Sequence, residues 1–169
     1  CFWKVISDCR AIVRDDLRVL GTLGSKYEAI YTRCDVGPEG SHGAVPMRRL
    51  LWASRIGPQK RPTLLVDIAH ALKDAGLDVA IEVYGMPDDG IDPREMFDGV
   101  APGIEYRGGF SAFQQLPISL YDAFLYTSEY DGLPNILLEA MAARLPVIAP
   151  NIGGIGEVVL PGVTGWLID

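Results

Sequence analysis

The chain has 169 residues, of which 49% are hydrophobic, so it is long enough to bury one core. Its 15 Lys and Arg against 22 Asp and Glu give a net charge of −7, which opposes the phosphate backbone of a nucleic acid. Nucleic acid is therefore excluded as the main partner, and any phosphate must be bound by a local group of positive charges.

The three cysteines, Cys1, Cys9 and Cys34, are odd in number and lack CxxC spacing. Reduced thiols in a cytoplasmic protein are the simplest interpretation. No apolar run approaches the roughly 20 residues of a membrane span, and the first ten residues lack the hydrophobic stretch of a signal peptide. We expect a cytoplasmic location.

The first segment predicts a strand at Trp3–Ser7, a helix around Ala11–Leu20 and a strand at Tyr27–Thr32. This unit is too small to fold alone. Residues 36–46 follow, with five Gly or Pro in eleven residues and almost no apolar content, which is typical of a linker. The expected organisation is a remnant of one domain at 1–36, a linker at 37–47 and a second domain at 48–169.

From Arg49 onward, short apolar runs alternate with amphipathic stretches, which is typical of parallel strands joined by crossover helices. The expected strands are Leu50–Ile56, Asp78–Tyr84, Ile104–Arg107, Ala123–Thr127, Val147–Ala149 and Trp166–Ile168, and the expected helices are Pro62–Ala75 and Pro134–Ala143. The predicted fold class is α/β, a Rossmann-like, doubly wound parallel sheet. Since no covering helix follows the last strand, we expect the domain to be truncated at its C-terminus.

Arg55 and Lys60 flank the turn SRIGPQKRP, which follows the expected strand end at Ile56. Pro62 suits the first position of the next helix, whose N-terminus would present unpaired N–H groups and a positive dipole end. Arg offers a rigid fork of donors and Lys a point charge, a combination suited to a diphosphate held without a metal. A solvated basic turn is the alternative.

A second candidate site is the segment SEYDGLPNILLEAMAARLPVIAP, where a strand leads into a loop and then a helix. Glu139 is the only charge in the first turns of this apolar helix. A partly buried carboxylate needs hydrogen-bond donors, which a pair of ribose hydroxyls would supply. An ion pair with an Arg explains Glu139 equally well.

Asp131 precedes Glu139 by eight positions, so the two carboxylates would lie along one ligand rather than on one atom. If Glu139 holds a ribose, Asp131 lies nearer the transferred group and can accept hydrogen bonds from sugar hydroxyls. Ordinary turn chemistry of Asp before Gly is the alternative.

These residues carry a family resemblance. Arg55 and Lys60, followed by DGLPNILLEAMAARLPVIAPNIGGIGEVV, closely resemble the C-terminal domain of GT-B glycosyltransferases of the large retaining family called family 4, the glycosyl transferases group 1. The resemblance spans roughly Leu50–Asp169. It implies transfer of a sugar from a UDP- or GDP-linked donor to a glycan or lipid-linked acceptor, with the acceptor held by an N-terminal domain of which residues 1–36 are a remnant.

The resemblance also implies individual roles. Arg55 and Lys60 match the residues that bind the donor diphosphate, and Glu139 matches the one that binds the ribose. Asp131 matches the acidic residue near the reacting centre, and it is the catalytic candidate. The other matches are the sugar and phosphate loop Gly132, Leu133, Pro134 and Asn135, and Tyr106 and Arg107 against the nucleobase.

One departure concerns the family's E-x7-E pattern, which usually begins with Glu where this chain has Asp131. The change keeps the charge but shortens the reach by roughly 1.5 Å. The identity of the donor sugar is therefore left open.

Two other patterns are weaker. Gly153, Gly154 and Gly156 lack GxGxxG spacing, so a permissive turn near the cleft is favoured over a dinucleotide site. Asp88, Asp89 and Asp92 lack DxD spacing, and Arg55 with Lys60 would supply the charge of a metal. We expect no metal and no cofactor besides the substrate nucleotide sugar.

Three functions compete: a donor-binding domain of a glycosyltransferase, inactive without its partner domain; a noncatalytic nucleotide-sugar-binding or regulatory module of the same fold; and a GT-B epimerase or phosphorylase. The second is supported only by Asp131 in place of Glu, and the third lacks its acidic constellation or cofactor lysine. The intact enzyme could also associate peripherally with the inner face of the membrane.

Overall fold

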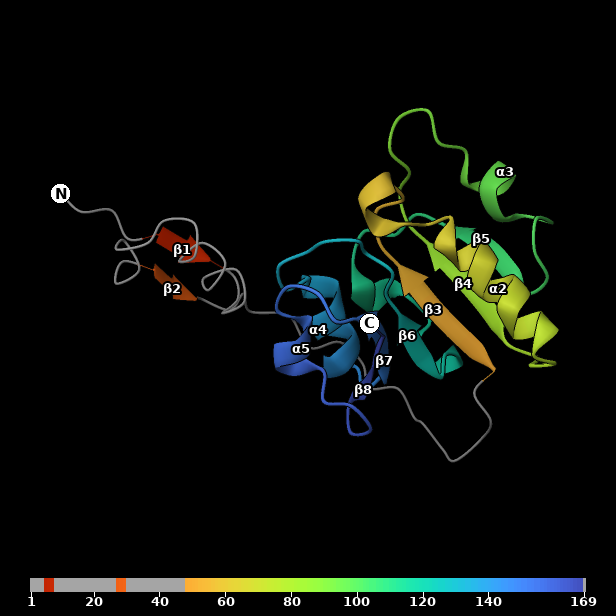
Figure 1. Ribbon diagram of the computed structural model, residues 1–169. Helices are drawn as coiled ribbons and strands as arrows, with labels where there is room; N and C mark the ends of the chain where they lie inside the picture. The colour runs from red at the N-terminus through yellow and green to blue at the C-terminus, as the bar shows by residue number, and fades with distance from the viewer. Residues whose placement is uncertain (1–4, 8–26, 30–47, 169) are drawn as a thin grey trace.

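The computed structural model describes residues 5–7, 27–29 and 48–168 of the chain (Figure 1). Two short strands, β1 (Val5–Ser7) and β2 (Tyr27–Ala29), pair in parallel, with Val5 opposite Tyr27. They confirm the two strands expected in the first segment. The helix expected between them, the linker and the three cysteines lie outside the described residues, so the domain division at 37–47 stays a prediction.

Within residues 48–168, six parallel strands form one sheet in the order β5-β4-β3-β6-β7-β8. The strands are β3 (Arg49–Ala53), β4 (Ala80–Tyr84), β5 (Ile104–Gly108), β6 (Ala123–Leu125), β7 (Val147–Pro150) and β8 (Gly165–Ile168). The chain builds outward from β3 to β5 and then returns to the other side of β3 to add β6, β7 and β8. The strand order therefore reverses between β3 and β6.

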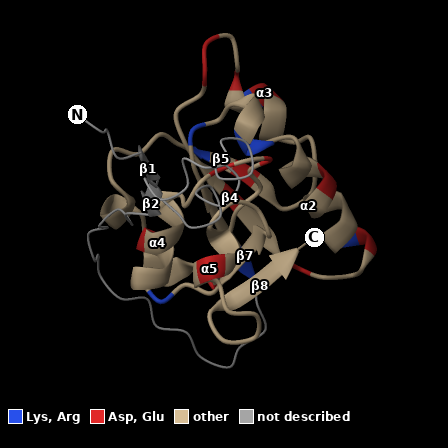
Figure 2. Cartoon of the chain, turned by 60° about the vertical axis from the view of Figure 1, so that its left-hand side comes forward, with Lys and Arg blue, Asp and Glu red and all other residues tan. Residues whose placement is uncertain are grey.

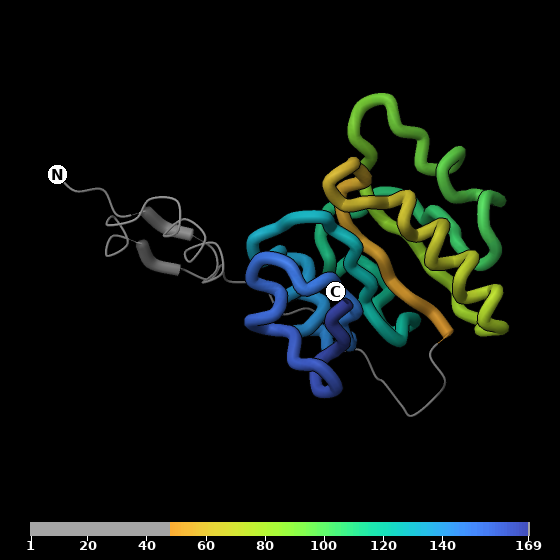
Figure 3. Tube along the Cα trace, in the orientation of Figure 1, coloured from red at the N-terminus to blue at the C-terminus, as the bar shows by residue number. Residues whose placement is uncertain are grey.

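Helices cover both faces of this sheet. α2 (Leu64–Asp74) and α3 (Pro93–Phe97) pack on one face, and α4 (Asn135–Ala142) and α5 (Ile155–Val158) pack on the other. In Figure 3 the first pair accompanies the yellow and green half of the sheet, and the second pair accompanies the blue half. The doubly wound, Rossmann-like α/β fold is confirmed.

The alternation of side chains along β3 explains why both faces are buried. Leu50 and Trp52 point into the core under α2 and α3, while Leu51 and Ala53 point into the core under α4 and α5. All four are at most 4% exposed. A run of apolar residues without polar alternation is what a central parallel strand requires.

The structure corrects two helix starts. Pro62 does not open α2, because the chain first forms a 3-10 turn, η2 (Pro58–Lys60), and Arg61 then adopts a left-handed conformation with φ of 48°. α2 begins only after Thr63. Pro134 is likewise the residue that precedes α4 rather than its first helical residue. The diphosphate candidate Lys60 thus lies on a tight turn, not directly at a helix N-terminus.

The helix α3 was not expected from the sequence. The loop after β4 contains α3, which Asp92 caps by accepting a hydrogen bond from the Arg94 N–H at 2.9 Å. Figure 2 shows acidic positions on the loop leading to α3 and on α5, whose first turn contains Glu157. No helix among the described residues is long and apolar enough to cross a membrane.

Candidate functional site

The reversal of strand order places the candidate site. In an open parallel sheet, the loops that leave the carboxyl ends of the two strands at the reversal part in opposite directions and leave a crevice. Here these strands are β3 and β6, and their loops carry the two segments that the sequence singles out, Arg55–Lys60 and Ser128–Asn135. Two segments more than 65 positions apart therefore meet at one sheet edge.

Three side chains converge at this edge. The Lys60 ammonium donates to Asp131 Oδ2 at 2.5 Å and to the Tyr126 hydroxyl at 2.9 Å. The Tyr126 hydroxyl donates to the same Asp131 oxygen at 2.5 Å. Asp131 Oδ1 accepts the backbone N–H of Gly132 at 3.0 Å. The structure thus brings Lys60 and Asp131 together, and it adds Tyr126, which the sequence analysis did not select.

The cluster is largely shielded from solvent, since the side chains of Lys60 and Asp131 are 14% and 19% exposed. Burial alone would raise the pKa of Asp131, but hydrogen bonds from Lys60 and Tyr126 outweigh it and hold the pKa below its ordinary value. Burial, followed by the hydrogen bond to Asp131, raises the pKa of Tyr126 well above its usual range. At neutral pH, Asp131 is therefore ionised and Tyr126 protonated.

Hydrogen bonds to backbone carbonyls join the two loops that carry these side chains. The Thr127 hydroxyl donates to the Lys60 carbonyl at 2.7 Å, and the Glu129 N–H donates to the Gln59 carbonyl at 2.9 Å. The Ser128 hydroxyl, on a residue only 1% exposed, lies 3.2 Å from the same Gln59 carbonyl. These contacts fix Lys60 relative to Asp131 before any ligand is bound.

Arg55 occupies a different position from Lys60. Its side chain is 59% exposed, and its contacts with Asp88 and Gln59 are long, at 3.4 and 3.5 Å. Such a pair in solvent contributes little to stability. The guanidinium can therefore turn toward a ligand at the crevice at small cost.

The loop Gly132–Asn135 leads from Asp131 into α4. Leu133 and Pro134 are buried, and Glu139 follows one turn into the helix, where it is half-buried. The Gly132 carbonyl accepts the N–H of Gly154 at 2.7 Å. The loop is thus supported from the NIGG segment after β7.

Gly153 allows the backbone of the NIGG segment to lie close against the Asp131 loop. It has a φ of +53°, and a Cβ at this position would lie 1.9 Å from the Asp131 carbonyl oxygen. Only glycine satisfies both the conformation and the space. The permissive turn predicted for this segment is confirmed at Gly153, which lies against the Asp131 loop, whereas Gly154 has an ordinary φ of −92°.

Tyr106 and Arg107, the two nucleobase candidates, lie at the end of β5. The Tyr106 hydroxyl donates to the Gly85 carbonyl at 2.9 Å, and Arg107 Nε donates to Glu82 at 2.9 Å. Both side chains are thus engaged with β4 and the residue that follows it. Their proposed contact with a base through the backbone stays a prediction.

Glu82 is a residue that sequence reasoning missed. It is 5% exposed and accepts hydrogen bonds from Arg49, Arg107 and Tyr121. Burial would raise the pKa of Glu82, but the bonds from Arg49, Arg107 and Tyr121 outweigh it and lower the pKa. The sequence does carry a signal for Glu82, because it is the only charge in the apolar strand AIEVY. As with Glu139, a carboxylate in an apolar segment needs hydrogen-bond donors.

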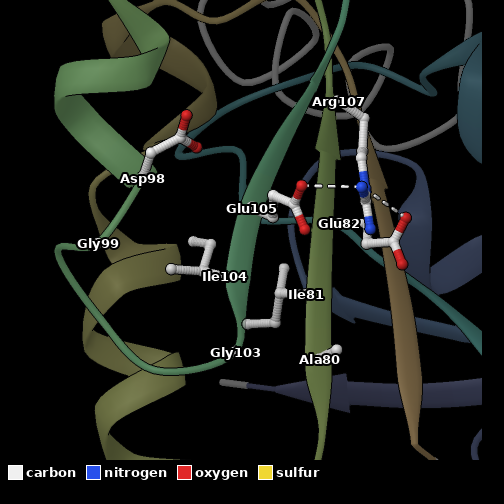
Figure 4. A pocket seen from close by; sticks show the side chains of 9 residues that line it. All are labelled: Ala80, Ile81, Glu82, Asp98, Gly99, Gly103, Ile104, Glu105 and Arg107. Carbon is white, nitrogen blue, oxygen red and sulfur yellow. Dashed lines mark hydrogen bonds and ion pairs between the residues drawn. The ribbon is translucent and has the colours of Figure 1, made fainter.

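A cavity of about 430 Å³ lies at the outer edge of the sheet, between β5 and the segment after α3 (Figure 4). Its lining includes Glu82, Glu105 and Arg107, and Asp98 lies on the other side of β5 from these three side chains. It is separate from the β3–β6 crevice and contains none of the diphosphate or ribose candidates. Within the described part of the chain, no three His, Cys, Asp or Glu side chains are grouped so as to hold a metal ion.

The family of the chain is identified by its similarity to known proteins. The family model described as glycosyl transferases group 1 matches residues 47–169. The chain belongs to the glycosyl transferases group 1 family. A similar curated relative, the GDP-mannose-dependent alpha-mannosyltransferase of Mycobacterium tuberculosis (strain CDC 1551 / Oshkosh), is 29% identical over 69% of this chain and 29% of its own length.

Two solved structures show the same fold. A mutant of S. aureus TarM in complex with fondaparinux, alpha-GlcNAc-glycerol and UDP has a TM-score of 0.82 at 22% identity, over 98% of this chain and 33% of that one. Anabaena Alr3699/HepE with UDP-glucose has a TM-score of 0.76 at 21% identity, over 97% and 49%. The fold is that of the Rossmann-like domain of GT-B glycosyltransferases. The chain spans less than half of each of these relatives.

Proposed function

We propose that this chain is the donor-binding domain of a retaining, metal-independent glycosyltransferase of family 4. The observation that carries the proposal is the meeting of Lys60 and Asp131 at the β3–β6 crevice, with Glu139 following on α4. A cation and a carboxylate at such a crevice suit a ligand that has a diphosphate next to a hydroxyl-rich sugar. The family membership supports the same assignment.

The roles follow from position. Lys60 and the exposed Arg55 bind the diphosphate, and Glu139 accepts hydrogen bonds from the ribose. Asp131 is the catalytic candidate and binds the transferred sugar beside the reacting carbon. Loop Gly132–Asn135 presents backbone groups to sugar and phosphate, and the end of β5 lies against the base.

The donor is a UDP- or GDP-linked sugar, and both kinds occur among the similar proteins: GDP-mannose in the name of one, UDP-glucose in the complex of another. The acceptor is a glycan or lipid-linked chain, held by a partner domain that includes residues 1–36. In the retaining reaction, the donor phosphate assists deprotonation of the acceptor, so no protein nucleophile is required. The intact enzyme acts in the cytoplasm, at the inner face of the membrane where the acceptor is lipid-linked.

The test of donor binding is a thermal shift of the chain with UDP and with GDP. A nucleoside diphosphate at 100 times its dissociation constant stabilises the folded state by about 2.7 kcal/mol, which raises the unfolding midpoint by several degrees. Lys60→Ala and Glu139→Ala should each abolish the shift. The matched controls Lys73→Ala and Glu95→Ala alter exposed residues on α2 and α3 and should retain it. No shift with either nucleotide contradicts the proposal.

A measurement of sugar transfer distinguishes the glycosyltransferase from the noncatalytic nucleotide-sugar-binding or regulatory module. A longer protein that contains both domains should transfer sugar from a bound donor to an acceptor, while the present chain alone should not. Donor binding without transfer by the longer protein, across nucleotide sugars and acceptors, would favour the regulatory module instead.

A further inference from the structure

The Tyr126 hydroxyl lies between the two charged groups of the site. Its oxygen accepts from the Lys60 ammonium at 2.9 Å, and its proton is donated to Asp131 Oδ2 at 2.5 Å. The Lys60 ammonium also lies 5.3 Å from the centroid of the Tyr126 ring. Tyr126 follows β6 directly, so the strand itself fixes where this hydroxyl stands.

These contacts use most of the acceptor capacity of Asp131. An ionised carboxylate offers about four lone-pair directions. Lys60 and Tyr126 take two at Oδ2, and the Gly132 N–H takes one at Oδ1. Among the contacts of the described residues, this leaves one direction at Oδ1 for a hydroxyl of the donor sugar, and the three bonds restrain the carboxylate from turning.

The Tyr126 hydroxyl stays protonated and therefore remains a hydrogen-bond donor to Asp131. Its ring is 2% exposed and stacks on Phe124, with ring centroids 6.4 Å apart. Burial and the neighbouring carboxylate keep the phenol protonated, so its proton is always directed at Asp131. Lys60 and Tyr126 are the titratable side chains that act on the Asp131 carboxylate.

We propose that Tyr126 is a positioning residue that fixes the Asp131 carboxylate beside Lys60, with one oxygen lone pair directed at the donor sugar. The proposal rests on the proposed function for its ligand. It assigns to Tyr126 a role in recognising the sugar and not the diphosphate, because the hydroxyl donates to Asp131 but only accepts from Lys60, so its removal takes no donor away from the diphosphate.

The test uses Tyr126→Phe, which keeps the ring and removes only the hydroxyl. Loss of a hydrogen bond to a charged group should weaken binding of UDP-glucose or GDP-mannose about tenfold. The affinity for UDP or GDP, which lack the sugar, should stay within about twofold.

A second readout needs no nucleotide. Carboxyl carbon NMR of the chain should show Asp131 titrating at higher pH in Tyr126→Phe than in the unmodified chain, since a bond to its charged form is lost. An unchanged Asp131 titration, or equal losses for sugar-bearing and sugar-free nucleotides, overturns the proposal. A shifted titration in a chain that binds no nucleotide supports the positioning of Asp131 but overturns the proposed function.

If Tyr126→Phe does not fold, Asp131→Asn tests the same contact from the other side. The ζ-carbon chemical shift of Tyr126 should move at neutral pH, because the phenol no longer donates to a charged acceptor. A shift that stays where it is in the unmodified chain overturns the proposal.

Discussion

The Trp52 indole donates a hydrogen bond to the Thr127 hydroxyl at 2.9 Å, although the two residues are 75 positions apart. Trp52 lies in β3 and Thr127 follows β6, and both are almost fully buried. The same hydroxyl donates to the Lys60 carbonyl at 2.7 Å. One side chain thus joins the two central strands to the turn that presents Lys60.

Thr127→Val should destabilise the chain by about 1–3 kcal/mol, because it leaves a buried indole N–H and a partly buried carbonyl without their partner. Urea unfolding measures the loss. Thr63→Val changes an exposed threonine whose side chain makes no capping bond, and it should cost less than about 0.5 kcal/mol. Equal effects of the two substitutions would contradict a structural role for Thr127.

Glu82→Gln should remove part of the acid sensitivity of folding. The pKa of Glu82 is lower in the folded chain than its ordinary value of 4.5. The ionised carboxylate therefore stabilises the folded chain above that pH, and this stabilisation is lost as the pH falls through the folded pKa. The variant should lose roughly 2 kcal/mol at pH 7 and show a flatter decline below about pH 4.5. Denaturant unfolding between pH 7 and pH 3 measures both.

Glu105→Gln is the control for that substitution. Glu105 also pairs with Arg107, at 2.8 Å, but it is 56% exposed, so its loss should cost less than about 1 kcal/mol. A variant at Glu105 as damaging as the one at Glu82 would contradict the assignment of the buried network to Glu82.

Gly153→Ala should lower stability by more than the roughly 1–2 kcal/mol that left-handed backbone costs an alanine. The additional loss arises because the new Cβ would collide with the Asp131 carbonyl and displace its loop. Gly162→Ala shares the positive φ but has open space around its Cβ, so it isolates the backbone cost. Thermal unfolding and UDP or GDP affinity of both variants measure the difference, and equal losses would contradict the packing argument.

Arg55→Ala should lower the affinity for UDP or GDP without lowering the stability of the fold. Because its contacts are long and exposed, stability should change by less than about 0.5 kcal/mol. Affinity for UDP or GDP should fall about tenfold with the loss of a bond to the diphosphate. Arg94→Ala, which removes a similarly exposed pair with Asp98 on α3, should leave both quantities unchanged, as calorimetry and urea unfolding can show.

The two candidate site segments were visible in the sequence because each carries a local pattern: an apolar strand, a Gly or Pro turn and a polar residue at the strand end. Local patterns also predicted the strands, since burial on both faces imposes continuous apolar runs. They failed at Pro62 and at α3. A left-handed Arg61 inserts a turn where a proline suggested a helix start, and the Asp92 cap lies in a loop whose Gly and Pro content concealed it.

The sequence alone therefore determined the α/β class, the strands and the chemical types of the candidate ligands, because these depend on neighbours within a few positions. Only the tertiary structure decided that Lys60 meets Asp131, that Tyr126 joins them, and that Glu82 is enclosed by two arginines. Those contacts span 25 to 71 positions of chain for all but the Tyr126–Asp131 pair. They follow from the order of strands in the sheet, which brings β6 beside β3, and no local pattern of residues encodes that order.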